Sequence, residues 1–90
     1  MDIANQASAT SEVAVAITVL INRQPVTFHE RKETGTEIKT TAINQGVTIQ
    51  TDFNLFLVEG PNKLKPIGDT DVIELHPNQE FRAVAPDDNS

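Results

Sequence analysis

Residues 13–46 read VAVAITVLINRQPVTFHERKETGTEIKTTAINQG. In the first nine of these residues every second side chain is Val or Ile, so a strand over Val13–Ile21 has one β-branched face that suits a core. The opposite face is small and partly apolar, which favours a central strand over an edge strand. After a turn at Asn22–Pro25, Val26 and Phe28 alternate with polar residues in the same way. Two such segments joined by a short turn predict a β-hairpin.

The start of a helix is predicted next, because residues 34–37 read TGTE and match the capping-box pattern. The Thr34 side chain would accept a hydrogen bond from the Glu37 N–H, and the Glu37 carboxylate would accept one from the Thr34 N–H. The charged residues 30–33, between the hairpin and this start signal, are predicted to form a loop.

The body of this helix is predicted over residues 35–45. Ile38 and Ala42 lie four residues apart and form a narrow apolar stripe, which is typical of a helix that lies across a sheet. Gly46 is placed to end the helix with a positive φ.

A third strand is predicted over residues 53–58, which read FNLFLV. Phe53, Leu55 and Leu57 would fall on one face, and the other face would contain Asn54. Because the first set is wholly apolar, we expect it to face the helix.

The remaining segments are shorter. Residues 63–66 carry two lysines and a proline, which are typical of an edge strand. Residues 72–75 read VIEL and form either a strand or the approach to one, and residues 79–84 form the last strand. The side chains expected to face the core from these segments are Ile67, Phe81 and Ala83.

The order of the elements predicts the fold. A hairpin, one helix and further strands give an α+β architecture, in which one helix packs on a mixed sheet of four to five strands. If the last strand lies beside the first and parallel to it, the fold is a β-grasp. The expected organisation is a flexible N-terminal arm over residues 1–12, the β-grasp domain over 13–84 and a flexible acidic tail over 85–90.

Composition excludes several classes of partner. Thirteen acidic residues against seven basic ones give a net charge of −6, so the chain lacks the positive surface that nucleic acid requires. No apolar run approaches the roughly 20 residues that span a bilayer, so we expect no membrane partner. The absence of cysteine excludes disulfides and thiolate chemistry and fits a reducing cytoplasm.

The residues needed for catalysis are not brought together by this sequence, so we expect no enzyme activity, no catalytic residue and no cofactor. The serines, Ser8, Ser11 and Ser90, lie in the two predicted ends, away from His29 and His76. We expect no metal site either, and interpret Asp69 and Asp71 as residues that stabilise a turn.

The segment from Ile17 to Val84 resembles the prokaryotic multiubiquitin domain, a bacterial branch of the ubiquitin-like β-grasp proteins. The similar parts are ITVLINRQPVTF over residues 17–28, TGTEIKTTA over 34–42, NLFLVEG over 54–60 and PIGDTDVIELHPNQEFRAV over 66–84. None of these is a catalytic signature.

The resemblance implies a bacterial protein modifier that supplies a C-terminal carboxylate on a flexible tail. The tail residues are Ala85, Pro86, Asp87, Asp88, Asn89 and Ser90. The implied partners are a ubiquitin-activating-type enzyme, a conjugating-type enzyme, a peptidase that processes the tail or removes the modifier, and a target protein. Chains of the modifier would be built on Lys32, Lys39, Lys63 or Lys65.

The tail departs from the familiar pattern because it does not end in Gly-Gly. Either the partner enzymes accept a different end, or a peptidase trims the tail first, or the protein is not conjugated. The alternative function is a non-covalent β-grasp module or self-assembly module. It would bind through an edge strand, through the N-terminal arm, or through a sheet face that contains Thr18, Leu20, Thr27 and Phe56.

Overall fold

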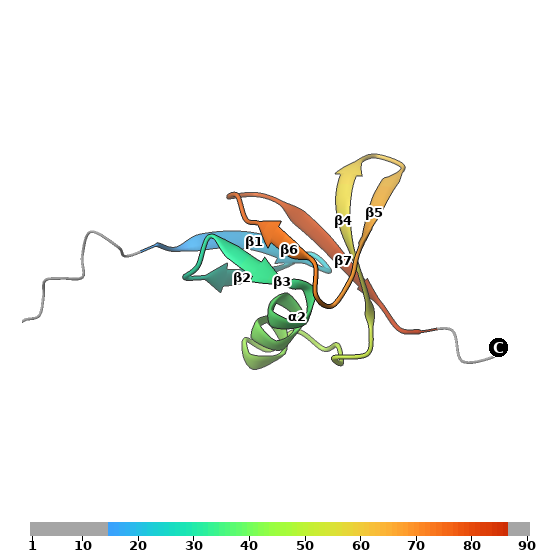
Figure 1. The fold of residues 1–90 in the computed structure, drawn as a ribbon, viewed down its shortest axis with the longest axis horizontal. Coiled ribbons are helices and arrows are strands. Elements are labelled where there is room, and N and C mark those ends of the chain that lie inside the picture. The colour runs from blue at the N-terminus through green and yellow to red at the C-terminus, as the bar shows by residue number, and fades with distance from the viewer. Residues whose placement is uncertain (1–14, 87–90) are drawn as a thin grey trace, which may run out of the picture.

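Five strands form the main sheet of the computed structural model, which describes residues 15–86. Their order is β2-β1-β7-β4-β5 (Figure 1). β7 runs parallel to its neighbour β1, and the other neighbouring pairs are antiparallel. The strands are β1 (Ile17–Ile21), β2 (Gln24–Phe28), β4 (Asn54–Gly60), β5 (Lys63–Ile67) and β7 (Glu80–Val84). The parallel contact between the first and last strands confirms the predicted β-grasp arrangement.

The first hairpin confirms the alternation read from the sequence. Ile17, Val19 and Ile21 are buried, and the residues between them on β1 are exposed. The turn consists of Asn22 and Arg23, both with positive φ (52° and 70°), so β2 already begins at Gln24. Because β2 and β7 pair with its two edges, β1 is a central strand, as predicted.

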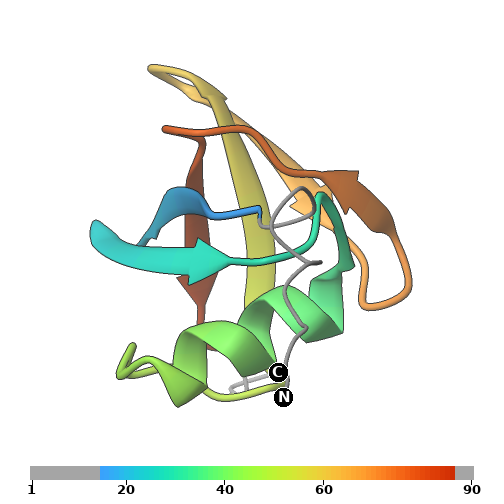
Figure 2. The same ribbon diagram turned by 90° about the vertical axis from the view of Figure 1, so that its left-hand side faces the viewer.

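The helix α2 (Gly35–Asn44) lies across one face of the sheet (Figure 2). The capping box forms as predicted: the Glu37 N–H donates to Thr34 Oγ1 at 3.2 Å, and the Thr34 N–H donates to Glu37 Oε1 at 2.8 Å. At the other end Gly46 has a φ of 101° and donates to Ile43 O, and the Val47 N–H donates to Ala42 O. These two bonds form a Schellman motif, which explains why the helix ends here.

The core lies between α2 and the sheet. Ile38 and Ala42 of the helix and Phe81 of β7 have no exposed surface and belong to one apolar cluster. The buried apolar residues are Ile17, Val19, Ile21, Val26, Phe28, Ile38, Ala42, Val47, Ile49, Leu55, Ile67, Leu75, Phe81 and Ala83. Leu55 is buried and Phe53 and Leu57 are partly buried against this cluster, so the predicted inner face of β4 is confirmed.

One predicted loop is wrong. Residues 32–34 form a strand, β3 (Lys32–Thr34), which pairs antiparallel with β6 (Val72–Glu74) in a second, two-stranded sheet. The pairing partner lies about forty residues further along the chain, and the local sequence KET has no apolar alternation to indicate a strand. Residues 72–75 were expected to form either a strand or the approach to one, and β6 shows that a strand forms there.

The ends of the chain lie outside the described residues. This applies to the predicted arm over residues 1–12, to Val13 and Ala14 of the first predicted strand, and to residues 87–90 of the predicted tail. Within residues 15–86, no helix is long and apolar enough to cross a membrane.

Candidate functional site

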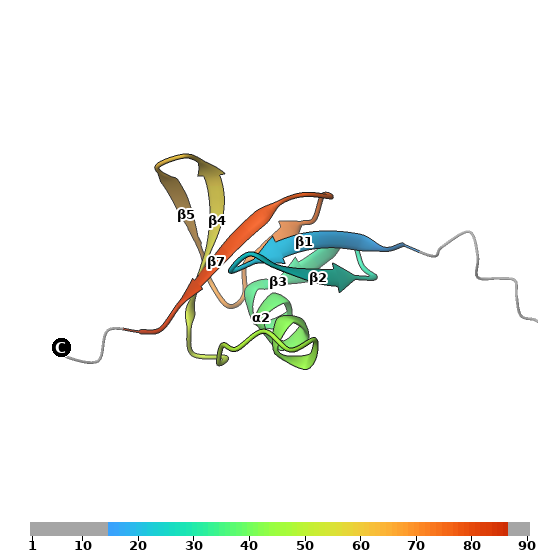
Figure 3. The same ribbon diagram turned by 180° about the vertical axis from the view of Figure 1, so that it is seen from behind.

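The point where the chain leaves β7 is the first part of the candidate site. β7 lies between β1 and β4 (Figure 3). Its Phe81 and Ala83 are buried and anchor the strand in the core. The Ala83 N–H donates to Asn22 Oδ1 at 2.9 Å, and Asn22 Nδ2 donates to Ala83 O at 3.0 Å. The Asn22 side chain therefore continues the pairing of β1 with β7 by one residue beyond the end of β1.

The described residues that follow Ala83 are exposed to solvent. Val84 keeps 45% of its surface exposed, and Ala85 and Pro86 are exposed as well. β7 ends at the opposite end of the molecule from the start of β1 (Figure 1). The geometry thus holds the chain firmly up to Ala83 and presents the next residues to solvent.

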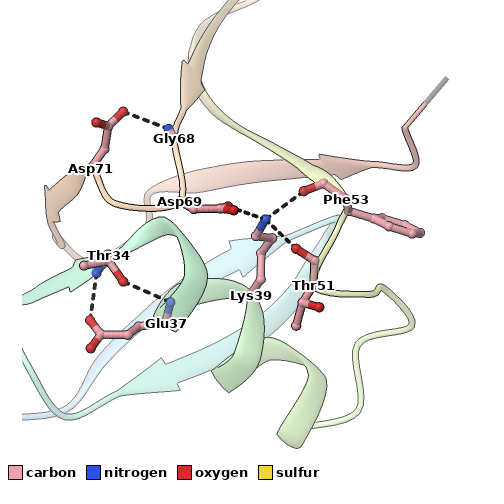
Figure 4. A network of polar contacts seen from close by, with 8 residues as sticks. All are labelled: Thr34, Glu37, Lys39, Thr51, Phe53, Gly68, Asp69 and Asp71. Atoms are coloured by element: carbon pink, nitrogen blue, oxygen red, sulfur yellow. Dashed lines mark hydrogen bonds and ion pairs between the residues drawn. The ribbon is translucent and has the colours of Figure 1, made fainter.

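The four lysines named as candidate acceptors do not share one environment. Lys32 on β3 and Lys63 and Lys65 on β5 are exposed. Lys39, on α2, is only 3% exposed. Its ammonium donates to Thr51 O at 2.7 Å, to Phe53 O at 2.9 Å and to Asp69 Oδ1 at 2.8 Å (Figure 4).

This environment explains why a lysine can be buried in so small a core. An ammonium has three hydrogens to donate, and each finds an oxygen here, one of them charged. The bonds tie α2 to the segment that precedes β4 and to the turn after β5. All three donor positions of Lys39 are therefore occupied, in contrast to the exposed amines of the other three lysines.

The turn between β5 and β6 uses both of its aspartates. Asp69 pairs with Lys39, and Asp71 Oδ2 accepts a hydrogen bond from the Gly68 N–H at 2.8 Å. The backbone oxygens of the same two aspartates accept from the Thr36 and Gly35 N–H groups of α2, each at 3.1 Å. Asp71 stabilises the turn as predicted, whereas the Asp69 side chain pairs with Lys39 instead. The turn also satisfies the first N–H groups of the helix.

One carboxyl group near this end of the helix has a shifted pKa. Partial burial of Glu33 raises its pKa above the usual 4.5, and the charges of Glu37 and Glu30 raise it further. Glu33 lies on β3 opposite Ile73 of β6.

The histidines lie in separate loops. His29 Nδ1 is 2.9 Å from Val15 O, in a hollow that is also lined by Glu30, Arg31 and Lys32. The backbone N–H of His76 donates to the Gln79 side chain at 2.8 Å. Residues 15–86 contain no serine or cysteine, and they bring together no group of three His, Asp or Glu side chains that could hold a metal ion.

The outer face of the sheet, on the side away from α2, forms the second part of the candidate site. We define the outer patch as Leu20, Phe56, Leu64 and Val84, which project from β1, β4, β5 and β7. Three of them keep between 37% and 45% of their surface exposed, and Phe56 is half-buried. Arg82 lies opposite Phe56 on β7.

Thr18 and Thr27 are less available than the sequence suggested. Their hydroxyl oxygens are 2.9 Å apart across the hairpin, so the two side chains satisfy each other.

Sequence reasoning missed two features of this site, the burial of Lys39 and the Asn22 clamp. The only local signal for the first is that Lys39 lies three residues before the buried Ala42, and therefore beside the apolar stripe. The Asn22 clamp joins residues that are 61 positions apart, and no local pattern indicates it.

Comparison with known proteins identifies the family. No curated protein and no solved structure is significantly similar to the chain. The model of the multiubiquitin family matches residues 17–87, a range that begins with β1 and includes both sheets and the helix. Because this match covers most of the chain and the fold is the ubiquitin-like β-grasp, the chain belongs to the multiubiquitin family.

Proposed function

We propose that this protein is a ubiquitin-like modifier of the bacterial cytoplasm, joined to a target through the carboxylate of the segment that follows β7. The observation that carries the proposal is the change at Ala83, where a strand clamped by Asn22 gives way to exposed Ala85 and Pro86. A modifier needs a rigid body for recognition and an extended end that can enter the active site of another enzyme. The family membership is consistent with this role.

The modifier itself supplies only the carboxylate in this proposal. An activating-type enzyme would join the carboxylate to AMP from ATP, with release of pyrophosphate. The acyl group would then pass to a conjugating-type enzyme with release of AMP, and from that enzyme to an amine of the target, which loses a proton and displaces the enzyme. A peptidase would trim the tail or reverse the attachment. Cleavage close to Asn89 removes the least and is the trimming site that we propose.

For chains of the modifier, we propose Lys32, Lys63 and Lys65 as acceptors. Nucleophilic attack requires an accessible, deprotonated amine. We omit Lys39 from the acceptors, because its ammonium is buried and donates to three oxygens. Arg in place of the true acceptor, at exposed positions 32, 63 or 65, should therefore remove the chains without disturbing the fold.

The test is a search for covalent conjugates in the native host. The chain is tagged at its N-terminus, purified under denaturing conditions, and examined for species heavier than the monomer. Mass spectrometry of the branched peptide then gives the terminal residue of the modifier and the acceptor. Conjugates that end in an intact Ser90 would contradict trimming but support conjugation.

A deletion of residues 86–90 is the matched control. It removes the residues after Ala85 and leaves the Asn22 clamp and the sheet in place, so the heavier species should disappear while the fold persists. If only the unmodified monomer is found while the partner enzymes are expressed, the modifier proposal fails.

The outer patch favours a second candidate, a non-covalent interaction module. Leu20, Leu64 and Val84 expose apolar surface from three strands of one sheet face, and such patches mark binding surfaces when they are contiguous. Leu20→Ser and Leu64→Ser should abolish capture of a non-covalent partner, and the deletion of residues 86–90 should not. The opposite pattern would favour the modifier.

A further inference from the structure

β2 lies at one edge of the main sheet and is unusual for an edge strand, because none of its residues carries a charge. Its residues, Gln24–Phe28, read QPVTF. The other edge of the sheet, β5, carries Lys63, Lys65 and Pro66, which discourage pairing with another chain. An uncharged edge with unpaired N–H and C=O groups invites strand addition unless something else covers it.

The Gln45 side chain covers the outer edge of β2. The Thr27 N–H donates to Gln45 Oε1 at 2.9 Å, and Gln45 Nε2 donates to Thr27 O at 2.7 Å. An amide group in this position makes the two bonds that a residue of a neighbouring strand would make.

These two bonds occupy the main pairing position on the edge. In an antiparallel pair, successive residues bond alternately to the neighbouring strand and away from it. Because both main-chain groups of Thr27 bond to Gln45, Thr27 faces away from β1, and so does Pro25, two residues earlier. Pro25 has no N–H to donate, so Thr27 carries the only outward N–H of β2.

The bonds between the Gln45 side chain and Thr27 can be broken easily. Gln45 is the C-cap residue of α2, and its backbone is held by bonds to the carbonyl oxygens of Thr41 and Ala42. Its side chain is exposed, and the bonds that it makes within the described residues are the two to Thr27. Rotation of this side chain would release both groups of Thr27 without disturbing the helix.

We propose that the outer edge of β2 is a strand-pairing surface held shut by the Gln45 amide, and that the strand it fits is β2 of a second copy. Two β2 strands related by a two-fold axis at Thr27 pair antiparallel. The Thr27 N–H of each copy then donates to the Thr27 carbonyl of the other, replacing the bonds to Gln45. No charge lies on either strand to oppose the contact. This inference is independent of the proposed modifier function.

The test compares Gln45→Met with Gln50→Met. Both changes replace an exposed glutamine by an apolar side chain of similar length, but only Gln45 bonds to Thr27. Sedimentation equilibrium over a range of concentrations should show self-association that is at least about tenfold tighter for Gln45→Met than for Gln50→Met or the parent chain, because two hydrogen bonds become available to the dimer. Added salt should strengthen the association, because it screens the net charge of −6 on each copy.

Hydrogen exchange of the Thr27 amide tests whether this amide is bonded to the Gln45 side chain. In the parent chain this edge amide should be protected. In dilute Gln45→Met it should exchange about tenfold faster, the factor expected when one side-chain hydrogen bond is lost. In the concentrated variant the protection should return.

A double variant, Gln45→Met with Thr27→Pro, separates strand pairing from a general effect of the exposed methionine. Proline removes the outward N–H, so the double variant should be monomeric. The proposal is overturned if the parent Thr27 amide exchanges as fast as an exposed, unbonded amide. It is also overturned if the parent or Gln50→Met associates as strongly as Gln45→Met, or if the double variant does.

Discussion

Lys39 shows how one residue of an acidic chain can have a structural rather than a chemical role. A buried charge is costly unless it is paired and hydrogen-bonded, and the three oxygens around this ammonium meet that condition. The side chain joins α2, the segment that leads into β4 and the turn after β5. Together with the bonds from the Gly35 and Thr36 N–H groups to the turn after β5, it fixes the position of the helix against these two segments.

Lys39→Met should be destabilising. It keeps the length and the apolar stem of the side chain but leaves the Thr51 and Phe53 carbonyls and Asp69 without their donor. We expect a loss of about 1–3 kcal/mol in the free energy of unfolding, measured by urea denaturation, because two carbonyls lose their donor while the Asp69 carboxylate is 65% exposed and can bond to water. Lys65→Met, at an exposed position, is the control and should cost less than about 0.5 kcal/mol. Equal stability of the two variants would show that the Lys39 bonds contribute little.

Glu33→Gln should stabilise the protein at neutral pH. The pKa of Glu33 is raised in the folded state, so between pH 4.5 and that raised pKa the folded chain binds more protons than the unfolded chain. The stability associated with this group is therefore fully present below pH 4.5 and is lost as the pH rises through the folded pKa. Thermal unfolding should give a higher Tm for Glu33→Gln than for the parent at pH 7, with the difference vanishing below pH 4.5. A variant that is less stable than the parent at pH 7 would contradict this explanation.

The helix α2 is short and depends on its two ends. A helix of 10 residues is not stable alone in water, so packing and capping must hold it in place. The capping box and the turn at residues 68–71 satisfy its N-terminal N–H groups, and the Schellman motif at Gly46 satisfies carbonyls at its other end. Gly35 allows the helix to approach the turn, because a Cβ atom at this position would collide with the backbone oxygen of Gly68.

Substitutions at the start of α2 should therefore differ in severity. Thr34→Ala removes one capping bond and should cost about 1 kcal/mol. Gly35→Ala should cost more than Thr34→Ala, even though alanine is the better helix former, because the backbone of the turn must move away. Chemical denaturation of the two variants ranks them, and a Gly35→Ala protein as stable as the parent would show that the turn adapts freely.

Residues 15–86 form a main sheet, a two-stranded sheet and one helix, and the core between them is correspondingly small. Fourteen buried apolar residues form a single cluster between the two layers. A domain of this size has a total stability of about 5–10 kcal/mol, so one core residue is a large share of it. Both sheets contribute to the cluster, since Leu75 at the end of β6 is buried with the strands of the main sheet.

Ile17→Ala tests this dependence. Ile17 is 5% exposed on the inner face of β1, and its truncation should cost roughly 2–5 kcal/mol, a large share of the total stability. Leu20→Ala, on the outer face of the same strand, should cost less than about 1 kcal/mol because Leu20 already keeps 37% of its surface exposed. Circular dichroism with urea titration measures both. If the two variants were equally stable, the assignment of the faces of β1 would be wrong.

Local patterns were sufficient for most of the architecture. The alternation along β1, the TGTE capping box and Gly46 depend on neighbours within a few residues, and each formed as predicted. The order of these elements led to the parallel contact of β1 with β7 and hence to the β-grasp. The multiubiquitin resemblance, expected over residues 17–84, was confirmed over residues 17–87.

Long-range contacts accounted for the rest, because they join residues whose local sequence carries no signal. The pairing of β3 with β6, the three oxygens around Lys39, and the side-chain clamps of Asn22 on Ala83 and Gln45 on Thr27 all form only once the layers are assembled. Each satisfies a polar group that local structure leaves unpaired, and the partner that satisfies it is set by proximity in space. That is why Lys39 was a candidate acceptor in the sequence and is a buried donor in the folded chain.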